Sequence, residues 1–63
     1  MLSSKTREWL LDRALKFKTR GNSDFAAARD AFAAKGLHYP DSIMDKSVRE
    51  IVADMRAKRK LAS

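Results

Sequence analysis

The stretch DKSVREIVADMRAKRK, residues 45–60, predicts an amphipathic helix with two distinct faces. An α-helix turns by about 100° per residue, so positions three, four and seven apart share a side. Apolar residues follow this spacing along one side, namely Met44, Val48, Ile51 and Met55, with Val52 widening the seam. Such a face must be buried, either against other helices of the chain or against a partner subunit.

The opposite side of the same helix carries positive charge. We call it the cation row; its spacing is 3, 7 and 4, with the small Ala53 in the gap, and its members are Lys46, Arg49, Arg56 and Lys60. Glu50 and Asp54 stack together beside the row rather than within it. Lys58 and Arg59 add positive charge near the end of the helix, where it also complements the helix dipole.

Two further helices are predicted upstream of this stretch. The first covers residues 4–20, where Leu10, Ala14 and Phe17 recur at helical spacing. Trp9 flanks them and is expected in the core or in a dimer contact rather than as a base-stacking platform. Gly21 is expected to adopt the left-handed conformation that often follows a helix end.

The second helix covers residues 24–35, with the alanine-rich sequence DFAAARDAFAAK. Asn22 or Ser23 is expected to cap its start, and Gly36 to follow its end in the left-handed conformation. Phe25 and Phe32 are seven residues apart, so they share one face with Ala28. We therefore expect both phenylalanines to anchor this helix in the core.

The third helix is predicted over residues 42–60, and its start has two interpretations. Asp41 or Ser42 could cap one long helix, bent near Lys46, or Ser47 and Glu50 could form a capping box that begins a shorter one. We favour the long helix. No segment alternates with the period of a strand, so the predicted fold is all-α, a single three-helix domain over residues 1–63.

The second and third helices could form a helix-turn-helix unit, with the third as the reading helix. The connection GLHYPD is longer than the three- or four-residue turn of that motif, however, and a looser three-helix domain fits equally well. A chain of 63 residues buries a modest core, and oligomerisation is one remedy, so a homodimer is a second expectation.

Composition argues against several classes of function. The chain has no cysteine, and its single histidine, His38, has no second histidine to share a metal, so we expect no cofactor and no metal site. No nucleophile motif, phosphate loop or clustered acid–base set is present, and we expect no enzyme. No apolar run could span a bilayer, and the acidic residues Glu8 and Asp12 argue against a transit peptide. A cytoplasmic protein is expected.

Charge is unevenly distributed along the chain, whose formal net charge is +6. Residues 1–22 carry +4, residues 23–45 carry −2 and residues 46–63 carry +4. Lysine and arginine displace condensed counterions from DNA, and an α-helix fits its major groove. The sequence therefore predicts a nucleic-acid-binding protein, DNA favoured over RNA and most simply double-stranded, such as a transcription or replication regulator of the phage or plasmid type.

The candidate binding residues have different expected roles. Arg49 and Arg56 are candidates for bidentate contacts to guanine edges. Phosphate contacts are expected from the remaining cations of the third helix and from a clamp at the end of the first, which together are Lys46, Lys58, Arg59 and Lys60, and Lys16, Lys18 and Arg20.

The main alternative is a protein–protein interaction module that binds an acidic partner, such as an accessory subunit or inhibitor of a larger enzyme. The segment DFAAARDAF, Pro40 and the ending RKLAS resemble the small theta subunit of bacterial replicative polymerases, over roughly half of the chain and with gaps. That resemblance implies an accessory-subunit role. A third class, binding of the first helix to a membrane surface, ranks lowest, because the other two helices need its apolar face.

Overall fold

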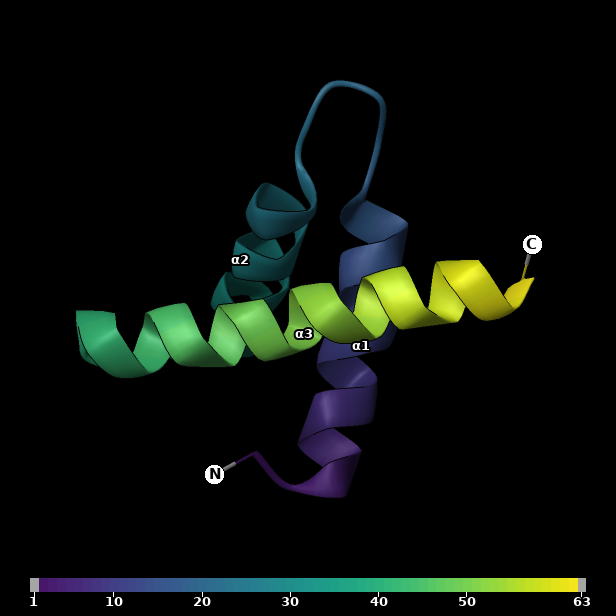
Figure 1. Ribbon diagram of the computed structural model, residues 1–63. Coiled ribbons are helices and arrows are strands. Elements are labelled where there is room, and N and C mark those ends of the chain that lie inside the picture. The colour runs from purple at the N-terminus through teal and green to yellow at the C-terminus, as the bar shows by residue number, and fades with distance from the viewer. Residues whose placement is uncertain (1, 63) are drawn as a thin grey trace.

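Three helices form the domain in a computed structural model that describes residues 2–62 (Figure 1). They are α1 (Ser4–Phe17), α2 (Asp24–Lys35) and α3 (Asp41–Ala62). α1 and α2 lie side by side, joined by a loop at one end, and α3 crosses both of them (Figure 1). No strand occurs within the described residues, which confirms the all-α, three-helix prediction.

The core lies between α3 and the α1–α2 pair. Its largest fully buried side chains come from all three helices and are Phe32, Leu10, Ile51, Met55 and Val48. Alanines of α2 complete it, since Ala27, Ala28 and Ala31 are fully buried and let the neighbouring helices approach closely. The predicted seam of α3 is thus confirmed, with Met44 half-buried at its edge.

The prediction that α1 extends to Arg20 is wrong. The helix ends at Phe17, and Lys18 is already extended, with φ −70° and ψ 123°. Asn22 stabilises this early end, because its side-chain amide donates to the Phe17 carbonyl while its carbonyl oxygen accepts from the Thr19 amide. These side-chain contacts replace the backbone bonds that another helical turn would have made.

The two glycines behave differently. Gly36 has φ 75° after the last turn of α2, and its amide donates to the Ala33 carbonyl, as predicted. Gly21 has no positive φ, so the prediction of a left-handed residue there is wrong. The start of α2 is capped by Ser23, whose hydroxyl oxygen accepts from the Ala26 amide at 3.1 Å.

The third helix is one continuous element of 22 residues, begun by Asp41 and ended by Ala62. The Met44 amide donates to the Pro40 carbonyl, which places Pro40 at the position just before the helix. The capping-box alternative is wrong, because Ser47 lies inside the helix and is buried. At about 1.5 Å per residue, α3 is about 33 Å long and extends beyond the α1–α2 pair (Figure 1).

None of the helices in the described part of the chain is long and apolar enough to cross a membrane.

Candidate nucleic-acid interface

The cation row lies on the side of α3 that faces away from the core. Lys46, Arg49, Arg56 and Lys60 are all exposed, whereas Val48, Ile51 and Met55 on the other side are buried. The helical spacing of these residues therefore predicts correctly that the row lies on the side of α3 away from the core. Lys46 forms no ion pair with another described residue.

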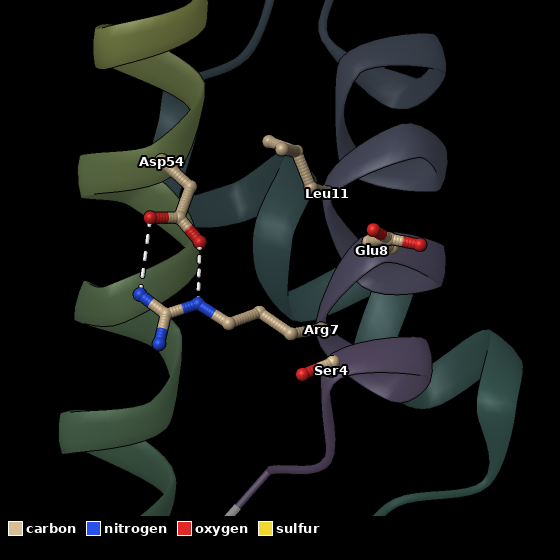
Figure 2. A pocket seen from close by; sticks show the side chains of 5 residues that line it. All are labelled: Ser4, Arg7, Glu8, Leu11 and Asp54. Atoms are coloured by element: carbon tan, nitrogen blue, oxygen red, sulfur yellow. Dashed lines mark hydrogen bonds and ion pairs between the residues drawn. The ribbon is translucent and has the colours of Figure 1, made fainter.

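The acids of α3 are turned toward α1. Arg7 donates from Nε to Asp54 Oδ2 at 2.7 Å and from a terminal nitrogen to Asp54 Oδ1 at 3.1 Å (Figure 2). Glu50 lies 4.0 Å from the same guanidinium. The two carboxylates raise the pKa of Arg7, with the Asp54 hydrogen bond as the larger cause. Arg7 therefore binds both acids on the side of α3 away from Arg56.

A hollow between α1 and α3 surrounds this pair, and Ser4, Arg7, Glu8, Leu11 and Asp54 line it (Figure 2). Both oxygens of Asp54 already occupy the recognition edge of the Arg7 guanidinium. The hollow therefore contains a bidentate ion pair that joins α1 to α3.

Asp24 binds two arginines of α3 from the start of α2. Its Oδ1 accepts from Arg59 at 2.7 Å and its Oδ2 from Arg56 Nε at 3.4 Å. The Arg59 hydrogen bond is the main reason that the pKa of Asp24 is lowered, and partial burial opposes it. Neither contact was predicted from the sequence, because residues 32 and 35 positions apart in the chain produce no periodic pattern.

One carboxylate between two guanidiniums neutralises only half of their charge. The Arg56 and Arg59 side chains remain 63% and 51% exposed, and each gives Asp24 a single N–H group. A guanidinium has five N–H donors, so most donors of both residues remain available to a phosphate. Arg49 is paired more conventionally, with Asp45 one turn away at 3.1 Å.

The remaining candidates do not form one surface. Lys58 is two residues away from Arg56 and from Lys60, which corresponds to about 200° around the helix axis. Lys58 therefore lies on the opposite side of α3 from both residues. Lys16 lies 4.0 Å from Asp12 on α1, and Lys18 donates to the Thr19 carbonyl. Arg20 is exposed in the loop that precedes Asp24. The N-terminal cations are thus split between a helix and a loop.

Of two aromatic residues with predicted core positions, only one lies there. Phe25 is 41% exposed, so the prediction that it anchors α2 in the core is wrong. Trp9 is half-buried against the core, as predicted, and two cations lie over its ring, Lys35 at 4.6 Å and Arg13 at 4.8 Å from the centroid. The Lys35 contact joins α1 to the end of α2 through cation–π attraction, whereas Arg13 lies on α1 like Trp9 itself.

Comparisons of the chain with protein-family models, with curated proteins and with solved structures found no match. The site is therefore interpreted from its own geometry.

Proposed function

We propose that this chain is a non-enzymatic nucleic-acid-binding protein that contacts double-stranded DNA through the cation row of α3. The observation that carries the proposal is the sorting of charge around α3. Arg7 holds Glu50 and Asp54 on the α1 side, while exposed cations line the solvent side. A phosphate backbone that approaches α3 from solvent would meet the cations first.

The binding would be governed mainly by phosphates. Each neutralised phosphate releases condensed counterions, which makes the affinity fall steeply with salt. Lys46 and Lys60 suit phosphate contacts as flexible point charges, and Arg49 and Arg56 have the planar fork that can bind a guanine edge. Arg49 would exchange its exposed pair with Asp45 for such a contact, a pair of the kind that stabilises by less than about 1 kcal/mol.

The test is a titration of a fluorescent DNA duplex over a series of salt concentrations. We expect a log–log salt slope of about −0.9 for each phosphate contact. The double variant Arg49→Ala with Arg56→Ala should bind at least about tenfold more weakly with little change in the slope, because these arginines are assigned to base edges. Lys46→Ala with Lys60→Ala should instead reduce the magnitude of the slope by about two contacts.

The chain offers a matched control for this experiment. Lys5 on α1 and Arg29 on α2 are exposed cations outside the row, so Lys5→Ala with Arg29→Ala removes the same net charge. If this control weakens binding as much as the α3 variant does, only overall charge matters and the interface is wrong. An affinity that does not change with salt would refute phosphate binding altogether.

The alternative, a module that binds an acidic protein, is favoured by one observation. Leu61 is 89% exposed near the end of α3 and is preceded by Lys58, Arg59 and Lys60. An apolar side chain among cations would suit an acidic amphipathic partner. Weakened capture of an acidic protein by Leu61→Ala, with duplex binding absent, would select this alternative. A homodimer, a regulator role and a cytoplasmic location also stay predictions.

A further inference from the structure

Phe25 lies in the first turn of α2 and is exposed although Arg56 of α3 reaches it. Phe32, seven residues later on the same face, is fully buried, whereas Phe25 is 41% exposed. The Arg56 guanidinium carbon lies 6.0 Å from the Phe25 ring centroid. The ring therefore has an arginine over one face, and the residue remains open to solvent elsewhere.

One carboxylate at the start of α2 holds two guanidiniums of α3, and the Arg56 guanidinium also lies over this ring. Asp24, the residue before Phe25, has a side chain only 11% exposed and accepts from both Arg56 and Arg59. The two arginines exceed this carboxylate by one positive charge. We call Phe25, Arg56 and Arg59 the Phe25 patch. It places a partly solvent-exposed aromatic ring beside cations that retain unused N–H donors.

We infer that the Phe25 patch binds an unpaired nucleotide, with the base stacked on the Phe25 ring and the adjoining phosphate accepting from Arg56 and Arg59. Aromatic rings beside cations bind single-stranded nucleic acid in this way, and stacking tolerates any base because each has a π-face. Bases inside a duplex are stacked on each other and cannot lie on the ring. The inference rests on the proposed function, because Arg56 belongs to both the cation row and the patch.

The proposed ligand of the Phe25 patch is therefore a nucleic acid with an unpaired segment. The test compares a single-stranded oligonucleotide of about 12 thymidines with a fully paired hairpin duplex, both fluorescently labelled. Phe25→Ala should weaken binding of the single strand by about tenfold, the usual loss for one stacked base, and change duplex binding by less than about twofold. Leu61→Ala is the matched control, since it removes the other exposed large apolar side chain among residues 2–62, and leucine cannot stack.

A second readout detects stacking directly. Phe25→Trp in a Trp9→Phe background leaves the only tryptophan of the chain at the patch. Its fluorescence should be quenched by the single strand and not by the duplex, with affinity for the single strand retained. Far-ultraviolet circular dichroism of each variant identifies any that fails to fold, and the quenching experiment does not depend on Phe25→Ala.

The outcomes separate the two proposals. The stacking inference would be overturned if Phe25→Ala weakened the binding of both ligands equally, if it left the single-strand affinity unchanged, or if no quenching occurred. In each case salt-dependent binding of the duplex would still support the proposed function. No binding of either ligand by the unsubstituted protein would overturn both. If polyglutamate bound in a Phe25-dependent manner as tightly as the single strand, the patch would be a protein-binding surface and the inference would be wrong.

Discussion

Two ion-pair clusters flank α3, and they have opposite stoichiometry. On the α1 side, one arginine, Arg7, binds the carboxylates of Glu50 and Asp54. On the α2 side, one carboxylate, Asp24, binds the guanidiniums of Arg56 and Arg59. The first cluster has one excess negative charge and the second has one excess positive charge. The positive character of α3 is therefore concentrated away from α1.

The clusters also differ in burial. The Asp24 side chain is 11% exposed, less than the 26% of Asp54, so its hydrogen bonds are screened less by water. Both clusters join segments far apart in sequence and both fix α3 on the α1–α2 pair. Similar surface ion pairs therefore have two effects in this domain. One cluster holds acids of α3 next to α1, and the other holds arginines of α3 next to the start of α2.

The largest effect is expected from a substitution in the core, because it weakens the packing of α3 and therefore both clusters together. Phe32→Ala deletes the largest fully buried side chain, at a cost of about 3 to 5 kcal/mol. A domain of this size has a total stability of about 3 to 9 kcal/mol, so the variant should lose between about a third and all of its stability. Thermal and urea unfolding followed by circular dichroism would measure the change. A loss below about 1 kcal/mol would show that the packing described here is wrong.

A smaller effect is expected from Asp24→Asn, which weakens only the cluster on the α2 side. We expect a loss of about 1 to 2 kcal/mol at neutral pH, since hydrogen bonds to a charged group are involved but the arginines are exposed. The folded-state pKa of Asp24 is lowered, so its contribution is present above the unfolded value of about 3.9 and is lost as the pH falls through the folded pKa. The stability gap between the two proteins should therefore close below about pH 4. A gap that stayed constant down to pH 2 would contradict this cause.

The smallest effect is expected from Asp54→Asn on the α1 side, at about 0.5 to 1 kcal/mol. The pair is bidentate, but the Asp54 carboxylate is more exposed than that of Asp24, and Glu50 remains near Arg7 in the variant. Urea unfolding beside Asp24→Asn, under the same buffer, gives the comparison directly. If Asp54→Asn proved the more destabilising of the two, burial would not be what ranks the clusters.

Much of the fold could be predicted from residue spacing. The apolar seam of α3, the end of α2 at Gly36 and its alanine-rich packing face follow from local periodicity and capping. The end of α1 could not be predicted in this way, because it depends on contacts of the Asn22 side chain with Phe17 and Thr19, which leave no periodic pattern in the sequence. Phe25 and Phe32 have the same periodicity, and only the crossing point of α3 distinguishes them.

The candidate site was predictable to a lesser degree. Periodicity correctly placed Lys46 and Arg49 on the exposed side of α3, but Lys58 lies around the helix from Arg56. The partners Arg7 and Asp24 were not assigned, because ion pairs between helices depend on how the helices cross.

Residue spacing and composition alone predict three helices, the buried side of α3 and the excess of positive charge, because each of these is a local property of the chain. Which charges are paired, which phenylalanine is buried and where the positive excess lies follow only from the fold. These properties depend on distances between residues that are remote in the chain, and the crossing of α3 over α1 and α2 sets those distances (Figure 1).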